Sequence, residues 1–341
     1  MSIHSELQST ITDLVVSGKG ILAADESHPT MSKRFKAINV ESTEQNRRDF
    51  RLLLVTTPNL GEFVSGVILF EETLMQKTDS GVSLPAAAAM QGIVPGIKVD
   101  KGVLPLDNAG GDVITQGLDG LAERLANYKA LGARFAKWRE VYSITGQNPT
   151  QLGIAANAEV LARYAAICQS LGIVPIVEPE VLLDGGHSIE RCFAVTEAVQ
   201  RAVFQALYHH GVELEYIILK PSMVVPGKDS AVKAGSEEIA EKTLKQLRRS
   251  VPAAVPGINF LSGGQSPEEA TLNLNSLNAL AGNAPWQLSF SYGRALQQPV
   301  LQAWQGKPEN VKAAQAALYK RAKLNSCARY GKYNSAMELK S

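Results

Sequence analysis

The stretch Leu214–Gly227, LEYIILKPSMVVPG, carries a single lysine, Lys220, at the end of an apolar run, and Pro221 follows at once. An apolar run without alternation predicts a strand over 216–219 that is buried on both faces. The prolines and Gly227 predict that the chain then turns. The sequence therefore places an amine where a buried strand opens into a loop. Lost hydration disfavours an ammonium there, and a neutral amine can attack a carbonyl to form a Schiff base.

A lysine at a strand end more often extends its charged head into water, so Lys220 alone does not establish covalent chemistry. The rest of the chain supplies the context, because short apolar runs like this one recur eight times at intervals of about 28–46 residues. The runs start at Gly20, Gly66, Val94, Ala133, Ile173, Glu215, Gly257 and Gln287.

The intervals between these runs carry amphipathic helix patterns, among them 120–132, 158–172 and 188–210. Eight strand and helix units predict an α/β fold, a (β/α)8 TIM barrel, formed by a single domain over 1–341. We expect an extra N-terminal helix over Glu6–Gly18 and a mobile tail over 332–341. A doubly wound open sheet is the alternative, and it is disfavoured because no GxGxxG opens the first unit.

The composition excludes several classes of partner. Lys plus Arg total 34 and Asp plus Glu 33 in 341 residues, so no overall field favours nucleic acid or a membrane. The three cysteines, Cys168, Cys192 and Cys327, lack CxxC spacing, which argues against disulfides and zinc and favours a reducing compartment. No HxH or HExxH pattern is present, so we expect no metal and no cofactor. The N-terminus lacks a signal-peptide pattern, and we expect a cytoplasmic protein.

The C-terminal strand ends form the active site of such a barrel, and here almost every end is polar. Side chains two residues apart on a strand face the same way, so three pairs should point into the mouth together. One or two such pairs could be a structural ion-pair layer, but so many carboxylates and amines at one mouth favour a functional site. The pairs are Lys98 with Asp100, Lys137 with Arg139, and Glu178 with Glu180.

Two glycine segments, LSGGQS and SYGRA, follow the last two predicted strands. Either could be an ordinary turn, but loops at these positions of a barrel commonly hold phosphate with backbone N–H groups. Arg294 adds a guanidinium fork that suits phosphate oxygens. Lys33 and Arg34, together with Lys98, could hold a second phosphate, the alternative being a solvated helix face. Two phosphate sites beside an imine-forming lysine imply a ketose bisphosphate.

Eight motifs, in this order, resemble those of class I fructose-1,6-bisphosphate aldolases: GKGILAADES, GIKVDKG, TQGLDGLAERLANY, FAKWR, VEPE, LKPSM, FLSGGQS and FSYGRALQ. The resemblance extends over nearly the whole chain, to GKY at 331–333. It implies metal-independent, reversible cleavage of fructose 1,6-bisphosphate into dihydroxyacetone phosphate and glyceraldehyde 3-phosphate. It also implies sugar phosphates as partners, without nucleic acid or membrane, and a homo-oligomer, by analogy a tetramer.

The resemblance assigns roles by motif. Lys220 becomes the Schiff-base lysine, Glu178 the proton-transferring carboxylate with Glu180 beside it, Lys137 the neighbouring ammonium, and Asp25 the base at the C4 hydroxyl. Adjacent carboxylates can carry a proton, because like charges favour the protonated form of one of them. Substrate contacts are expected at Ser27, Thr30, Lys33, Arg34, Lys98, Arg139, Ser262, Gly263, Gly264, Ser291, Gly293 and Arg294.

Two departures from the family pattern stand out. After AADES the animal and plant enzymes have a segment close to TGSIAKRL, whereas this chain has HPTMSKRF, so Thr30 replaces a serine. The animal enzymes also end in a tyrosine on a long tail, and this sequence stops at Ser341. Two alternatives remain open, a related lyase acting on sedoheptulose 1,7-bisphosphate and a non-catalytic scaffold on an aldolase frame.

Overall fold

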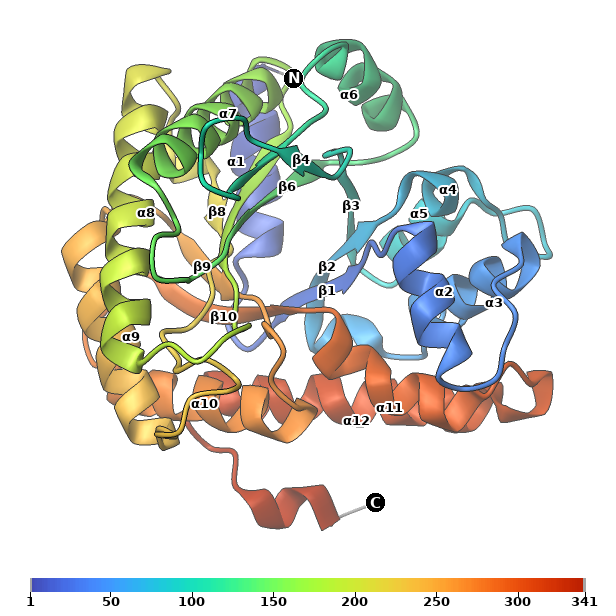
Figure 1. The fold of residues 1–341 in the computed structure, drawn as a ribbon. Helices are drawn as coiled ribbons and strands as arrows, with labels where there is room; N and C mark the ends of the chain where they lie inside the picture. The colour runs from blue at the N-terminus through green and yellow to red at the C-terminus, as the bar shows by residue number, and fades with distance from the viewer. Residues whose placement is uncertain (1, 340–341) are drawn as a thin grey trace.

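The computed structural model describes residues 2–339 and shows a closed barrel of eight parallel strands (Figure 1). The strand order around the barrel is β1-β10-β9-β8-β7-β6-β3-β2. The predicted TIM barrel and its eight strands are confirmed, and the open sheet is excluded. The strands are β1 Gly20–Ala24, β2 Val64–Leu69, β3 Val94–Lys98, β6 Phe135–Tyr142, β7 Val174–Val181, β8 Ile218–Leu219, β9 Gly257–Phe260 and β10 Gln287–Tyr292.

Helices surround the barrel, and several begin at the Ser or Thr caps that the sequence offers. Between residues 2 and 339, no helix combines the length and the apolar character that crossing a membrane requires. The α-helices are α1 Ile3–Leu14, α2 His28–Lys36, α3 Glu44–Val55, α4 Glu71–Met75, α5 Leu84–Ala89, α6 Leu121–Ala130, α7 Gln151–Ser170, α8 Ile189–His209, α9 Ser236–Ser250, α10 Pro267–Leu280, α11 Arg294–Trp304 and α12 Val311–Arg329.

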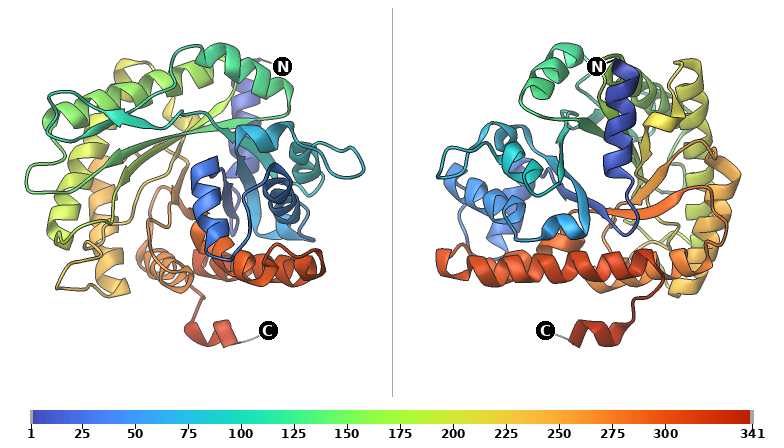
Figure 2. Two further views of the ribbon diagram at one scale, coloured as in Figure 1. Left: turned by 45° about the vertical axis from the view of Figure 1, so that its right-hand side comes forward. Right: turned by 180° about the vertical axis from the view of Figure 1, so that it is seen from behind.

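The N-terminal helix α1 packs against the N-terminal end of the barrel, as the right-hand view of Figure 2 shows. Its buried face, with Leu7 and Leu14, joins an apolar cluster with inward residues of the strands, including Phe135 of β6. The Phe135 ring fits only because Gly96 has no side chain, since a Cβ there would lie 2.3 Å from the ring. This apolar cluster is called the floor below.

The stretch around Lys220 departs in part from the expected strand. Only Ile218–Leu219 form strand β8, whereas Leu214–Tyr216 form a 3-10 turn, because the Tyr216 N–H bonds the Glu213 carbonyl. The prediction of a strand from Tyr216 was therefore wrong. The Lys220 N–H still donates to the Val177 carbonyl of β7 at 2.8 Å, which fixes its backbone at the end of the strand.

A hairpin that the sequence pattern did not predict follows β3. Strands β4 Val103–Pro105 and β5 Val113–Thr115 pair antiparallel, outside the barrel. Each strand has three residues, and the surrounding segment is rich in Gly and Asp, so neither gives a strand periodicity that exceeds a loop signal. The hairpin therefore lies between β3 and α6 as an insertion (Figure 1).

The tail beyond α12 folds into a 3-10 helix over Ser335–Leu339, which both views of Figure 2 show beside the body of the protein. Tyr333 is buried, and its hydroxyl donates to Glu338. Glu338 also pairs with Arg321 of α12. The expected mobility of 332–341 stays a prediction, and residues 340–341 lie outside the described part of the chain.

Candidate active site

Lys220, Glu178 and Lys137 meet at the mouth of the barrel and come from three adjacent strands or strand ends. The Glu178 carboxylate bridges the two amines, with Oε1 3.0 Å from Lys220 Nζ and Oε2 3.0 Å from Lys137 Nζ. All three side chains are about 95% buried or more. A proton donor or acceptor therefore lies within reach of the one amine that stands at the end of β8.

Asp25 joins the same cluster from the end of β1, with Oδ2 2.8 Å from Lys137 Nζ. Burial alone would raise the pKa of Asp25, but the ammonium groups of Lys137 and Lys220 outweigh it and hold that pKa well below its usual range. Burial likewise opposes the charge on Lys137, yet Asp25 and Glu178 raise its pKa well above the usual value. The cluster therefore contains an ionised carboxylate beside a charged ammonium.

Asp100 is a member of this cluster that the predicted site residues did not include. Its Oδ1 accepts from Lys98 Nζ at 2.5 Å, and its Oδ2 lies 3.9 Å from Lys137 Nζ. Asp100 follows Lys98 by two residues, and this spacing was the sequence signal that could have identified it. Residues two apart on a strand point to the same face, so both side chains enter the mouth. Asp100 orients the Lys98 ammonium and adds negative charge beside Lys137.

Arg139 and Glu180 form an ion pair with each other, at the rim of the mouth. The charge of Glu180 helps to raise the pKa of Arg139 above the usual range, against the effect of burial. We expected Glu180 to share a proton with Glu178, but the structure instead gives each carboxylate its own cations. The nearest partners of Glu178 are ammonium groups.

The residues predicted from the segment after β1 lie on α2. Ser27 is its N-cap residue, and the Ser27 hydroxyl lies 3.3 Å from that of Thr30. Lys33 and Arg34 are one turn further on and share a face with Thr30. Arg34 pairs with Glu26, a buried carboxylate that also binds Arg51 of α3 and Gln297 of α11. Glu26 was another omission, and it fixes α2 against its neighbours.

The predicted phosphate loops after β9 and β10 lie side by side. A Cβ on Gly264 would be 3.4 Å from Arg294 Nη2, so the two loops approach closely. Gly263 and Gly264 have φ of +48° and +92°, a backbone conformation that favours glycine. Ser262 and Ser291 are buried, and the Ser291 hydroxyl has no partner within residues 2–339. Arg294 is exposed, and the described chain offers it no carboxylate within ion-pair distance.

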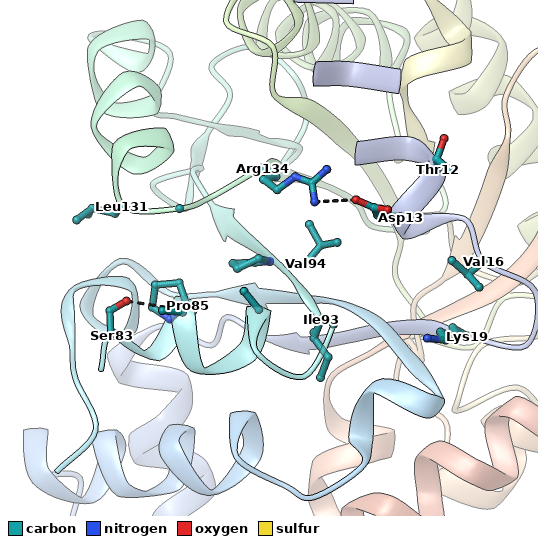
Figure 3. Close-up of a pocket in the computed structure, with 15 residues that line it drawn as sticks. Thr12, Asp13, Val16, Lys19, Ser83, Pro85, Ile93, Val94, Leu131 and Arg134 are labelled. Atoms are coloured by element: carbon teal, nitrogen blue, oxygen red, sulfur yellow. Dashed lines mark hydrogen bonds and ion pairs between the residues drawn. The ribbon is translucent and has the colours of Figure 1, made fainter. Parts of the chain in front are cut away.

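The pocket drawn in Figure 3 lies at the other end of the barrel, beside α1, and has a volume of about 460 Å³. An ion pair between Asp13 and Arg134, with 2.8 Å between Oδ2 and Nη1, crosses it. None of the predicted site residues lines this pocket. The chemistry-bearing side chains of the described chain are instead concentrated at the mouth.

An eight-stranded parallel barrel with a buried lysine, a carboxylate and a second ammonium at its mouth defines a class of enzyme that acts on carbonyl compounds through a lysine imine. Comparison with known proteins specifies the family. The family model described as "Glycolytic: Fructose-bisphosphate aldolase class-I" matches residues 6–341. The chain belongs to the class I fructose-bisphosphate aldolase family, and it cleaves fructose 1,6-bisphosphate to dihydroxyacetone phosphate and glyceraldehyde 3-phosphate through a Schiff base.

The relatives are similar over nearly their whole length. Chloroplastic fructose-bisphosphate aldolase 1 of Chlamydomonas reinhardtii is 56% identical over 98% of this chain and 88% of that protein. Cytosolic aldolase 4 of Arabidopsis thaliana is 56% identical over 94% and 82%. The aldolase of Plasmodium falciparum, solved with TRAP and a small-molecule inhibitor, superimposes with a TM-score of 0.96 at 53% identity, covering 98% of this chain and 96% of that one.

Proposed function

We propose that Lys220 is the imine-forming residue and that Glu178 moves the protons of imine formation and hydrolysis. The observation that carries this proposal is the Glu178 carboxylate, whose two oxygens lie 3.0 Å from Lys220 Nζ and from Lys137 Nζ. An amine with an adjacent proton carrier can attack the C2 carbonyl and lose water. The positive charge on Lys137 stays with the cluster throughout, because Asp25 and Glu178 raise its pKa.

The cleavage step then needs an electron sink and a base. Asp25 removes the proton of the C4 hydroxyl, the C3–C4 bond breaks, and glyceraldehyde 3-phosphate leaves as the aldehyde. The electron pair of that bond enters the protonated imine at C2 and forms an enamine. Protonation at C3 and hydrolysis of the imine release dihydroxyacetone phosphate and restore the Lys220 amine. The low pKa of Asp25 means that the carboxyl group is ionised, which is the form that accepts a proton, although the same shift lowers its basicity.

Two groups of residues are proposed to hold the phosphates. The loops after β9 and β10 would hold the phosphate nearest the imine, through backbone N–H groups, Ser262, Ser291 and Arg294. The opposite phosphate would meet α2 and the polar ends of β3 and β6. This second group is Ser27, Thr30, Lys33, Arg34, Lys98 and Arg139.

Borohydride reduction in the presence of dihydroxyacetone phosphate, followed by peptide mapping, tests the assignment. We expect a label on Lys220 alone, because only this lysine combines a strand-end position with a bridging proton carrier. The Lys220→Ala variant should lose both the label and cleavage while circular dichroism shows an intact fold. A label on Lys98 or Lys137 would overturn the assignment.

Metal independence is a separate proposal. An imine at C2 provides the electron sink without a cation that polarises the carbonyl. Exhaustive treatment with EDTA should therefore leave the cleavage rate unchanged. Loss of activity that added zinc restores would contradict this.

Substrate range and organisation complete the proposal. We infer fructose 1,6-bisphosphate as the preferred substrate over sedoheptulose 1,7-bisphosphate, which the ratio of the two kcat/KM values tests. The chain is proposed to form a single domain, to assemble as a homotetramer and to act in the cytoplasm. The Arabidopsis relative is cytosolic and the Chlamydomonas relative chloroplastic, so fractionation of cells decides the compartment. Light scattering measures the assembly.

A further inference from the structure

Glu140 is a fully buried carboxyl group that the proposed reaction does not use. It lies on β6 between Arg139 and Val141, and its side chain faces away from the mouth that Lys137 and Arg139 occupy. Its Oε1 accepts from the indole N–H of Trp138 at 2.8 Å, and its Oε2 accepts from the backbone N–H of Thr115 at 3.3 Å. Within residues 2–339 no Lys or Arg lies within ion-pair distance of it.

The titratable groups around Glu140 are acidic. Asp100 approaches from the β3 end, and Tyr142 follows on β6, with its hydroxyl buried and without a partner in the described chain. Asp112, which precedes β5, acts on Tyr142. Burial, supported by the charge of Asp100, raises the pKa of Glu140 from 4.5 to about 8, although its two hydrogen bonds oppose the shift. Its contribution to the free energy of unfolding is therefore full below pH 4.5 and is lost as the pH rises toward 8.

Glu140 is joined to the mouth through Thr115, the last residue of the hairpin. The Thr115 N–H binds Glu140, and the Thr115 hydroxyl donates to the Arg139 carbonyl at 2.8 Å. The other end of the hairpin, Val103, follows Asp100 by three residues, and the Lys101 N–H donates to the Gln116 carbonyl at 2.9 Å at the base of the hairpin. Holding Thr115 against β6 therefore also holds the backbone that carries Asp100.

Asp100 in turn places two proposed phosphate contacts. Its carboxylate binds the Lys98 ammonium, and it accepts from the Arg139 backbone N–H at 3.4 Å. A displaced hairpin would shift Asp100, and Lys98 would follow because the two are bonded. In the part of the chain that the structure describes, no comparable hydrogen-bond link runs from Glu140 to the loops after β9 and β10, which lie across the barrel from β6 in the strand order.

We propose that Glu140 is a positioning residue: it fastens the β4–β5 hairpin to β6 and thereby sets Asp100, Lys98 and Arg139 for the phosphate farther from the imine. The proposal rests on the proposed function, which assigns that phosphate to Lys98 and Arg139. Ionised Glu140 keeps its bonds to the N–H groups of Trp138 and Thr115, but it adds a second negative charge beside Asp100. This charge repels the Asp100 carboxylate and weakens the attraction of the neighbouring cations for a phosphate. The KM for fructose 1,6-bisphosphate should therefore rise above pH 8, while kcat and the trapping of dihydroxyacetone phosphate on Lys220 change little.

The test compares the wild type with Glu140→Gln between pH 6 and pH 9.5. The wild-type KM should rise roughly three- to tenfold across this range, as expected for weakening one phosphate contact. The variant should begin with a modestly higher KM, because an amide nitrogen cannot accept one of the two N–H groups, and then show no rise. Glu159→Gln, an exposed carboxylate on α7 that pairs with His210, makes the same chemical change and should behave as the wild type.

Infrared difference spectra should show a protonated carboxyl band that disappears near pH 8 in the wild type and is absent from Glu140→Gln. A pH-dependent rise of KM that persists unchanged in Glu140→Gln would overturn the proposal. If that variant does not fold, Thr115→Val decides instead. It removes the hydroxyl bond to Arg139, keeps the N–H bond to Glu140, and should raise KM without lowering kcat. An unchanged KM in Thr115→Val would count against the proposed attachment of the β4–β5 hairpin to β6. Failure to label Lys220 would count against the proposed function.

Discussion

The floor and the mouth of the barrel are formed by the same strands. Along a strand, the inward-facing residue of the floor and the inward-facing residue of the mouth are only two positions apart. Inward positions near the strand starts join the apolar cluster with α1, and the next inward positions carry charges. On β1 Ala23 precedes Asp25, on β6 Phe135 precedes Lys137, on β7 Ile176 precedes Glu178, and on β8 Ile218 precedes Lys220. On each of these four strands, the change from apolar to ionic surroundings therefore occurs between two inward-facing residues that are two positions apart.

The two layers contribute differently to the molecule. The floor removes apolar surface from water, at about 25 cal/mol per Å². The mouth places several charges in a buried site, where desolvation offsets much of the attraction between them. Near the floor, the buried guanidinium of Arg329 donates to the backbone carbonyls of Val16 and Lys19, which carry no net charge. We infer that the floor stabilises the fold and that the mouth is retained for chemistry.

The largest effect is expected from Lys137→Met, which keeps the size of the side chain but leaves Asp25, Glu178 and Asp100 without their shared cation. The free energy of unfolding should fall by about 3–5 kcal/mol, because buried charges lose their partner. The cleavage rate should fall by on the order of 10²- to 10⁴-fold. Urea unfolding and steady-state kinetics measure the two effects.

Arg294→Ala should affect binding without affecting stability, because the exposed guanidinium has no acid partner in the described chain. We expect the affinity for dihydroxyacetone phosphate to fall roughly ten- to hundredfold, as about 1.5–3 kcal/mol of charge-assisted contact is lost. Calorimetric titration provides the measurement. A loss confined to glyceraldehyde 3-phosphate would mean that the two phosphate sites are exchanged.

Gly96→Ala tests the floor, and it adds an atom where the two preceding variants remove a charged group from the mouth. The new Cβ would lie 2.3 Å from the Phe135 ring, so the ring or the strand must move. Overpacking of this kind costs about 1–3 kcal/mol of stability. If the floor is only structural, KM and kcat at temperatures below unfolding should equal those of the wild type. A lower kcat with an unchanged melting temperature would remove the distinction between the two layers.

Much of this arrangement could be predicted from the sequence, because strand periodicity and the alternation of side chains are local properties. The spacing of Lys98 with Asp100 and of Lys137 with Arg139 already indicated which side chains enter the mouth. Side-chain pairing between different elements is not fixed by these local patterns, so the sequence did not show that Arg139 pairs with Glu180 or that Arg34 pairs with Glu26. The hairpin was missed for a related reason, since strands of three residues depend on Thr115 meeting β6.

The tail gives the smallest expected effect and separates stability from chemistry once more. From the sequence, deletion of Asn334–Ser341 should change neither activity nor stability. The structure revises the second expectation, because Glu338 is the carboxylate that meets the buried guanidinium of Arg321 and the Tyr333 hydroxyl. The deletion should therefore lower the free energy of unfolding by about 1–2 kcal/mol, and Glu338→Gln should reproduce most of that loss. The rate of proton exchange at C3 of dihydroxyacetone phosphate, followed by NMR, should stay within about twofold of the wild-type rate. A surface change away from the site usually alters a free energy by no more than the amount that corresponds to about this factor in a rate. A large fall in exchange with intact trapping on Lys220 would instead assign the tail a part in protonating the enamine.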